Sequence, residues 1–188
     1  MTAGKPFVSA APTPPGAPIA SSAHAEEAQA SDPHRLRHAL GRFATGVTLV
    51  TAADPSGAPV GLTVNSFASL SLEPPLVLWS LREASPTLSA FRAAPRFAVN
   101  VLAESQIELS RVFASRHAHR FAAGAWQCGD DGVPLLVGAA ATFLCATVSQ
   151  QQAGDHVLFI GRVLHFADSH EPPLLFQGGR YRRLGTVL

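Results

Sequence analysis

The chain has 188 residues, of which 47% are hydrophobic and only 14% are charged, and its formal net charge is +1. This length is sufficient for one domain with a core of its own. So small a net charge argues against nucleic acid or an acidic membrane surface as a partner. The two cysteines, Cys128 and Cys145, form neither a disulfide framework nor a metal site by number or spacing. We therefore expect a cytoplasmic protein, and the low fraction of charge predicts surface buried in a homodimer.

The first 31 residues are rich in Ala, Pro and Ser and show no periodicity. We expect residues 1–31 to be a disordered leader and residues 32–188 to form one domain. No apolar run is long enough to span a bilayer, and the N-terminus lacks the charged start and apolar stretch of a secretory signal. The sequence therefore predicts no membrane segment.

The domain is expected to begin with a helix. Asp32 and Pro33 are a favourable N-cap and first helical residue, and the helix is expected to run to Gly46. Its apolar face would consist of residues at helical spacing: Leu36, Leu40, Phe43 and Val47. A basic stripe on the same helix is open to two interpretations, a solvated face or a partner for a nucleotide phosphate: Arg35, His38 and Arg42.

The rest of the domain's sequence predicts strands joined by turns. Strands are expected at residues 47–52, 61–65, 75–81, 97–102, 135–148, 157–166 and 180–184, with hairpin turns at 54–57 and 178–179. The apolar run at 75–81 predicts a strand buried on both faces. Short helices are expected at 85–91 and 105–114, the second with a capping box formed by Ser105 and Glu108. Residues 115–132 lose the pattern and predict a long loop.

Many strands joined by hairpins, with only three short helices, indicate a mainly β (α+β) protein. An antiparallel barrel with short flanking helices suits this pattern better than a doubly wound sheet. No G-x-G-x-x-G follows a strand, and neither a P-loop nor a G-x-S-x-G elbow is present. A Rossmann nucleotide site is therefore not supported.

One stretch, residues 61–75, carries the clearest functional pattern. Apolar and polar residues alternate up to Asn65, and short hydrogen-bonding side chains then follow closely: Thr63, Asn65, Ser66, Ser69 and Ser71. The alternation breaks after Ser66, which predicts a bend with accessible backbone amides. Because Asn is unfavourable inside strands, it is usually there to make a specific hydrogen bond. We expect this strand end to hold a flat, polar-edged ligand without a charged anchor.

Histidine and cysteine chemistry is less well supported. His117 and His119 lack a carboxylate at ligand spacing, so we predict no metal site. Cys145 lies in an apolar strand and is expected to be a small buried hydrophobe, although a Cys–His nucleophile pair is not ruled out. His156 follows Gly154 and Asp155 at a turn, where it is equally consistent with an imidazole at a barrel mouth and with an exposed residue after an Asx-type turn.

An ordered set of motifs resembles a known family. The segments are GRFATGVTLVT (41–51), GLTVNSFASLSLEPPLVLWSL (61–81), FAVNVL (97–102), Gln106…Leu109-Ser110…Phe113-Ala114, GDH (154–156) and Gly179…Tyr181…Leu184. Together they resemble the flavin reductase family with the FMN-binding split-barrel fold, which includes reductase components of two-component flavin monooxygenases. The resemblance covers residues 35–184.

The resemblance implies a homodimer of split barrels that takes FMN, or FAD, as flavin and NADH or NADPH as reductant. Implied flavin contacts are Thr63, Val64, Asn65, Ser66, Ser69, Ser80, Leu81, Ser85, Asn100, Val101, Leu102 and Phe113, with Ser110 and Arg111 near the phosphate. His156 and Tyr181 would flank the nicotinamide, with His156 as the one catalytic candidate. The resemblance also implies that reduced flavin passes to a partner flavin-dependent monooxygenase.

Two other classes remain open at this point. A split-barrel protein could hold FMN or haem without being a reductase, although such a module has no need of the GDH turn together with Tyr181. A purely structural dimerisation barrel would bind no flavin at all. The sequence does not decide between FMN and FAD or between NADH and NADPH.

Overall fold

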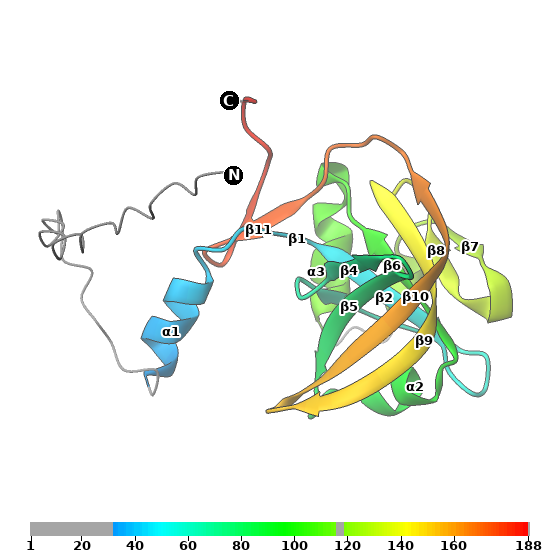
Figure 1. Ribbon diagram of the computed structural model, residues 1–188. Helices are drawn as coiled ribbons and strands as arrows, with labels where there is room; N and C mark the ends of the chain where they lie inside the picture. The colour runs from blue at the N-terminus through cyan, green and yellow to red at the C-terminus, as the bar shows by residue number, and fades with distance from the viewer. Residues whose placement is uncertain (1–31, 116–118, 188) are drawn as a thin grey trace, which may run out of the picture.

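The computed structural model describes residues 32–115 and 119–187, and its centre is a seven-stranded antiparallel sheet. The strand order is β3-β2-β6-β9-β10-β5-β4, and the sheet curls around its core (Figure 1). Its strands are β2 (Thr48–Ala53), β3 (Pro59–Val64), β4 (Ala68–Leu72), β5 (Pro75–Arg82), β6 (Arg96–Val101), β9 (Ala141–Ala153) and β10 (His156–Asp168). The expected mainly β, antiparallel split-barrel class is confirmed. The proposed leader at residues 1–31 lies outside the described residues, so its boundary stays a prediction.

Aromatic side chains pack together on the inner face of the curled sheet. Trp79 and Phe159, on the paired strands β5 and β10, stack with ring centroids 4.5 Å apart, and both are essentially inaccessible to solvent. Phe91 and Phe97 meet the Trp79 ring edge-on. Each such side chain contributes about 1.5–3 kcal/mol through burial, so this cluster is a main source of stability.

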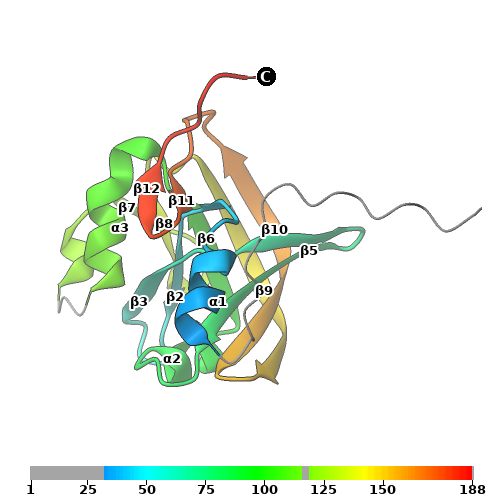
Figure 2. The same ribbon diagram turned by 90° about the vertical axis from the view of Figure 1, so that its left-hand side faces the viewer.

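Strand β5 departs from its prediction, because it is buried on one face only. Val77, Trp79 and Leu81 face the core, whereas the alternate residues Leu76, Leu78 and Ser80 are half-buried. Strands β4 and β5 form a hairpin that projects from the body (Figure 2). The apolar residues on its second face therefore lie nearer the surface of the chain and not in its core.

Helix α1 (Pro33–Leu40) starts as predicted, because Asp32 Oδ1 accepts hydrogen bonds from the backbone N–H groups of His34 and Arg35. It ends at Gly41 and not at Gly46, which is a correction to the predicted boundary. Beyond it, β1 (Thr45–Gly46) pairs with β11 (Leu175–Gln177). The backbone of Val47 then bonds to Leu174 and Leu102, so strand pairing competes with helix in this segment. No residue of α1 is buried.

Helix α3 (Ile107–Ala114) falls within its expected range, whereas α2 (Leu88–Ala93) begins three residues later and ends two residues later than expected. The capping box predicted from Ser105 and Glu108 is wrong. A 3₁₀ turn, η1 (Glu104–Gln106), precedes α3, and Gln106 Oε1 accepts a hydrogen bond from the Ala103 N–H at 3.0 Å. Helix α3 lies against β3 at Gly61, where an added Cβ would come within 3.1 Å of the Phe113 ring.

The predicted loop at residues 115–132 contains structure that the pattern did not indicate. Beside the short turns η2 (Arg120–Ala122) and η3 (Asp130–Gly132), strand β7 (Trp126–Cys128) pairs with β8 (Pro134–Leu136). The strand predicted at 135–148 is consequently divided, with β8 in this hairpin and β9 in the main sheet. Trp126 packs on Phe113 and Phe121, and these long-range contacts stabilise the segment.

The chain ends in a small sheet of β1, β11 and β12 (Arg180–Arg182). The predicted turn at Gly178 and Gly179 is confirmed, with both residues at positive φ, a conformation that glycine adopts without strain. The last strand ends at Arg182, two residues earlier than predicted. Within residues 32–115 and 119–187, no helix has the length and hydrophobicity needed to cross a bilayer.

Candidate functional site

A small cavity of about 180 Å³ lies between the end of β3, helix α3 and the β11–β12 hairpin. We call its polar lining residues, together with Val64, the polar shelf: Thr63, Val64, Asn65, Ser110 and Tyr181. Three apolar residues complete the wall: Val47, Ala114 and Phe176. The lining thus holds hydroxyl and amide groups beside apolar and aromatic surface, and none of its residues is charged.

Hydrogen bonds fix the inner side of the shelf. Thr63 Oγ1 donates to the Ser110 carbonyl at 2.8 Å, and Ser110 Oγ lies 2.9 Å from Tyr181 Oη. These contacts join β3, α3 and β12, three segments that are far apart in the sequence. Asn65, in contrast, is exposed at the cavity. The arrangement positions one exposed amide beside a rigid row of hydroxyl groups.

Arg111, on helix α3, lies beside the shelf residue Tyr181. Its guanidinium lies 5.7 Å from the centroid of the Tyr181 ring, within the range of a cation–π interaction. It also forms an ion pair with Glu108, one turn earlier on the same helix. Arg111 therefore lies at the rim of the shelf, where it can reach an anion without lying under a bound ring.

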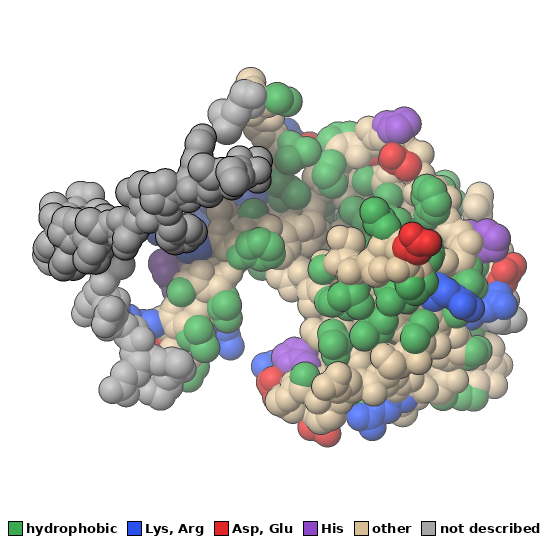
Figure 3. All heavy atoms as spheres, viewed as in Figure 1, with side chains coloured by type: hydrophobic (Ala, Val, Ile, Leu, Met, Phe, Trp, Pro, Cys, Tyr) green, Lys and Arg blue, Asp and Glu red, His purple; other side chains and the backbone are tan. Residues whose placement is uncertain are grey.

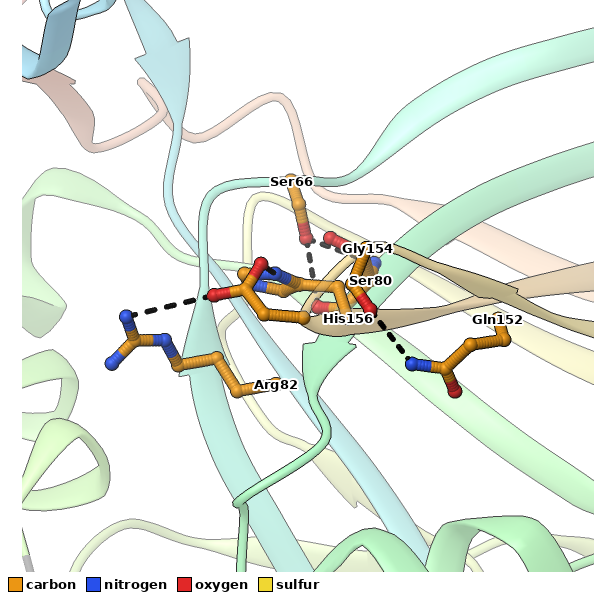
Figure 4. A network of polar contacts seen from close by, with 7 residues as sticks. Ser66, Ser80, Arg82, Gln152, Gly154 and His156 are labelled. Carbon is orange, nitrogen blue, oxygen red and sulfur yellow. Dashed lines mark hydrogen bonds and ion pairs between the residues drawn. The ribbon is translucent and has the colours of Figure 1, made fainter. Parts of the chain in front are cut away.

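A second group of predicted residues meets at the other side of the bend after β3. Ser66 Oγ accepts a hydrogen bond from Ser80 N at 3.0 Å and donates to Ser80 O at 3.1 Å. Figure 4 shows Ser66, Ser80 and His156 close together. Ser80 pairs with Leu158 across the ladder, and His156, two residues earlier, pairs with Arg82. Since side chains alternate along a strand, Ser80 and His156 belong to the same face of the sheet.

His156 is held by its neighbour in the turn. Its Nδ1 lies 2.7 Å from Asp155 Oδ1, and Arg82 lies 4.0 Å from the same carboxylate. The hydrogen bond and the charge of His156 lower the pKa of Asp155 below its usual value. Asp155 thus orients the imidazole through its side chain, and the His156 side chain is 37% exposed. It is available to a ligand from outside.

Besides Ser110, four of the predicted flavin contacts have buried side chains, and their part in binding flavin stays a prediction. Asn100 is fully buried: its amide donates to Leu49 O and Thr51 Oγ1, and its Oδ1 accepts from Leu136 N. Its side chain therefore holds strands and the β8 segment together. The other three belong to the hydrophobic core: Leu81, Leu102 and Phe113. None of these four side chains lines the shelf.

The remaining predicted residues lie apart from the shelf. Ser69, on β4, lines an apolar groove of about 570 Å³ beside the projecting hairpin. Val101 lines a different surface cavity, next to Phe143 and Phe166. Ser85 begins the turn before α2, where its hydroxyl contacts Thr87. A ligand bound at the shelf would contact these three residues only if it were large enough to extend to them, or if a second protein surface brought them closer.

Sequence reasoning missed Phe176, Val47 and Ala114 as walls of the shelf, and Arg82 as a partner of Asp155. Phe176 lies opposite Tyr181 in the β11–β12 register, with ring centroids 5.6 Å apart. The alternation around the Gly178–Gly179 turn could have identified it. Arg82 carried no such signal, since its role depends on the register between β5 and β10.

The described residues hold no cluster of three His, Cys, Asp or Glu side chains that could bind a metal ion. His117 lies outside them. Burial raises the pKa of Cys145 to about 12, which keeps its thiol protonated and unsuited to nucleophilic chemistry. The arrangement therefore offers a binding surface with aromatic, hydroxyl and amide groups, and no acid–base or thiolate machinery.

This geometry matches known proteins closely. The family described as flavin reductase like domain matches residues 40–185. The NADH-dependent FMN reductase SmoA of Agrobacterium fabrum is 47% identical over 148 residues, which cover 79% of this chain and 84% of the relative. A probable flavin reductase of Rhizobium meliloti is also 47% identical, over 154 residues that are 82% of this chain but 50% of the relative. This chain thus spans about half the length of that relative.

Solved structures agree with the sequence matches. The NADH:FAD oxidoreductase SgcE6 of Streptomyces globisporus superposes with a TM-score of 0.81 at 36% identity, covering 89% of this chain and 96% of that one. From the matched domain, the shared identity and the shared fold, it follows that this chain belongs to the flavin reductase family.

Proposed function

We propose that this flavin reductase uses NADH or NADPH to reduce FMN, with FAD as the alternative, and releases the reduced flavin to a separate flavin-dependent monooxygenase. Relatives support both parts. SmoA is named an NADH-dependent FMN reductase, and another relative, 43% identical, is the reductase subunit HsaB of a flavin-dependent monooxygenase in Rhodococcus jostii. SgcE6, named an NADH:FAD oxidoreductase, has been solved with NAD and FAD fragments.

The observation that carries the proposal is the polar shelf, an uncharged cavity with an exposed amide at its edge. A flavin accepts the hydride when bound, so the protein's task is to position the two rings. Asn65 and the backbone of the bend at Ser66 offer hydrogen bonds to a polar ring edge, and Thr63 keeps the strand end fixed to α3. At about 180 Å³ the cavity takes only part of a tricyclic ring, which suits a flavin that exchanges with solvent.

Other residues would act at the rim. Arg111 suits the flavin phosphate, because a guanidinium forms charge-assisted hydrogen bonds with phosphate oxygens. His156, oriented by Asp155 at 2.7 Å, would position the nicotinamide from the Ser66–Ser80 side. Tyr181 would contact it from the opposite side, through a ring held by Ser110. None of these roles requires a general base.

A homodimer completes the proposal. The projecting β4–β5 hairpin exposes Leu72 at 93%, and Phe166 on β10 is 74% exposed beside the apolar groove. Helix α1 stands away from the sheet and exposes Leu40 at 66% (Figures 1 and 3). An eight-residue helix is marginal in water by itself, and the β4–β5 hairpin projects beyond the body of the sheet, so a second copy of the chain is the occupant we assign to these surfaces. It would also bring Ser69 and Ser85 nearer to a bound flavin.

We place the protein in the cytoplasm, where reduced nicotinamide is available and where two free cysteines persist without pairing. Steady-state assays with each pairing of FMN or FAD with NADH or NADPH test the activity directly. We expect turnover of free flavin added in excess over protein. Flavin binding without oxidation of either nicotinamide would contradict the proposal and favour a non-reductase binding protein.

A further inference from the structure

A second cavity, of about 520 Å³, lies between helix α1 and the β11–β12 turn. Its lining carries an unusual concentration of cationic and imidazole side chains: His34, Arg37, His38, Arg42, Arg180 and Arg182. We call it the basic cavity. The sequence left the basic stripe of Arg35, His38 and Arg42 open between a solvated face and a phosphate partner. The fold brings two of its members, His38 and Arg42, together with Arg180 and Arg182 from the far end of the chain.

Two hydrogen bonds to backbone carbonyls hold the two walls of the basic cavity together. Gly178 N donates to Gly41 O at 2.8 Å, and Gln177 Nε2 donates to Arg42 O at 3.2 Å. A Cβ added at Gly41 would lie 3.5 Å from Gly178 Cα, which is ordinary contact distance. Gly178 itself adopts a positive φ of 57°, which suits glycine in the turn that meets the end of α1. The arginines are placed in one concave surface by main-chain structure and not by chance contacts of long side chains.

The charges of the basic cavity are not balanced by carboxylates. No Asp or Glu residue lines it. In the part of the chain that the structure describes, none of its four arginines takes part in an ion pair, whereas the nearby Arg183 pairs with Glu104 at 3.2 Å and Arg111 pairs with Glu108. Gathering like charges in a concave surface is unfavourable by itself and concentrates positive potential there. This arrangement is typical of a surface that binds a small polyanion.

The basic cavity and the polar shelf share the β11–β12 hairpin. Tyr181 lines the shelf, while its neighbours Arg180 and Arg182 line the basic cavity. This division follows from the alternation of side chains along a strand. An extended ligand with a ring at the shelf and phosphates beyond it can therefore contact both sides of one strand. A flat protein surface fits a recessed cavity less well than a nucleotide does.

We propose that the basic cavity binds the diphosphate of a dinucleotide, either FAD or a nicotinamide dinucleotide, whose ring lies at the polar shelf. This inference rests on the proposed function for the position of the ring. Guanidinium groups suit phosphate because they donate paired hydrogen bonds and keep their charge at all relevant pH values. FAD and the nicotinamide dinucleotides both contain this pair of linked phosphates, and the experiment below distinguishes which of them binds in the basic cavity.

The test compares Arg37→Ala and Arg180→Ala, one from each wall, with Arg92→Ala, an exposed arginine of α2 with the same change in charge. Dissociation constants are measured for riboflavin, FMN, FAD, NADH and NADPH on the full chain. We expect both cavity variants to weaken one dinucleotide about tenfold, as the loss of a charge-assisted hydrogen bond implies, and to leave riboflavin unchanged. Arg92→Ala should change none of the constants.

The ligands whose affinity falls show which dinucleotide places its diphosphate in the basic cavity. A selective loss for FAD assigns the cavity to the flavin's adenylate half, and a selective loss for NADH and NADPH assigns it to the reductant. Unchanged affinity for every dinucleotide, or an equal loss for riboflavin, overturns the proposal. Arg37→Lys and Arg180→Lys, which keep the charge, should restore part of the affinity if the variants are folded. Failure of the proposed function is seen separately, as absence of turnover by the unaltered protein.

Discussion

Ser110 Oγ lies 2.9 Å from Tyr181 Oη, and this contact joins helix α3 to the last hairpin of the chain across the polar shelf. Ser110 is fully buried, and its carbonyl also accepts the hydrogen bond from Thr63. One serine therefore connects β3, α3 and β12. The shelf depends on this connection for the position of both its strand end and its aromatic ring.

A double-mutant cycle measures that connection. Tyr181→Phe and Ser110→Ala each remove one partner, and we expect the two changes in the free energy of unfolding to be non-additive by about 0.5–1.5 kcal/mol, the usual net value of such a hydrogen bond. Urea unfolding of the two single variants and the double variant gives the coupling energy. Strict additivity would show that the two hydroxyl groups do not interact in solution.

Asn100 is predicted to matter for stability and not for flavin. Asn100→Ala removes three buried hydrogen bonds and leaves the Leu136 N–H unsatisfied, so we expect a loss of about 3 kcal/mol or more. Chemical denaturation measures the loss, and FMN titration of the folded fraction should give the wild-type dissociation constant. Weakened flavin binding in a stably folded Asn100→Ala protein would return Asn100 to the site.

Asn65 should behave in the opposite way. It is exposed at the polar shelf, so Asn65→Ala should change the free energy of unfolding by less than about 0.5 kcal/mol. The affinity for FMN should fall about tenfold, as expected when a hydrogen bond of about 1.4 kcal/mol is lost. Fluorescence titration with FMN provides the measurement, and Asn100→Ala serves as the matched control. Unaltered FMN affinity would move the ring away from Asn65.

His156 is expected to act on the nicotinamide. Its imidazole lies near Ser66 and Ser80 and does not line the polar shelf. We therefore expect His156→Ala to raise the KM for NADH several-fold and to leave the dissociation constant of FMN unchanged. Steady-state kinetics at saturating FMN measures the first quantity and flavin titration the second. The reverse pattern would place His156 beside the flavin.

The Asp155–His156 contact also predicts a pH effect. The pKa of Asp155 is lowered in the folded protein, first by the hydrogen bond from His156 and then by its charge. Such a carboxylate stabilises the fold above its ordinary pKa, and the contribution is lost as the pH falls through the lowered value. NMR titration should find the Asp155 pKa higher in His156→Ala than in the wild type. An unchanged Asp155 pKa would contradict the contact.

The two cysteines should differ sharply in reactivity. Cys145 is buried and its pKa is raised to about 12 by desolvation, whereas Cys128 is exposed. A thiol reagent at pH 8 should therefore modify one thiol in the native protein and both after unfolding. Cys128→Ser is the control, because it should abolish the native reaction. Two reactive thiols in the native protein would show that the β9 core opens readily.

Gly161 provides a test of the packing that supports the site. A Cβ at this position of β10 would overlap the Phe97 ring, with Cε1 at 2.8 Å, and would lie 3.0 Å from Cys145 Cβ. We expect Gly161→Ala to lower the free energy of unfolding by about 1–3 kcal/mol through overpacking. Thermal denaturation measures this, with Gly185→Ala as control because no atom lies within 4 Å of its Cβ. A neutral Gly161→Ala would mean that the strand shifts easily.

Local pattern determined much of this protein in advance. Period-two alternation located most strands of the main sheet, the Asp32–Pro33 pair located the start of α1, and Gly178–Gly179 located the last turn. The ordered motifs indicated the family. Each of these signals depends on residues that are neighbours in the chain, and backbone propensity and side-chain alternation act over that range.

Contacts between distant segments decided the rest. Alternation could not show that Asn100 is bonded to Leu49 and Leu136, because its burial depends on which strands lie on either side. It could not place Arg82 against Asp155, or Arg180 beside Arg37, for the same reason. The sequence by itself determined most strands of the main sheet and the family. Strand register and the meeting of α1 with the last hairpin decided which polar groups are gathered at each cavity, because both depend on packing and backbone hydrogen bonds between distant segments.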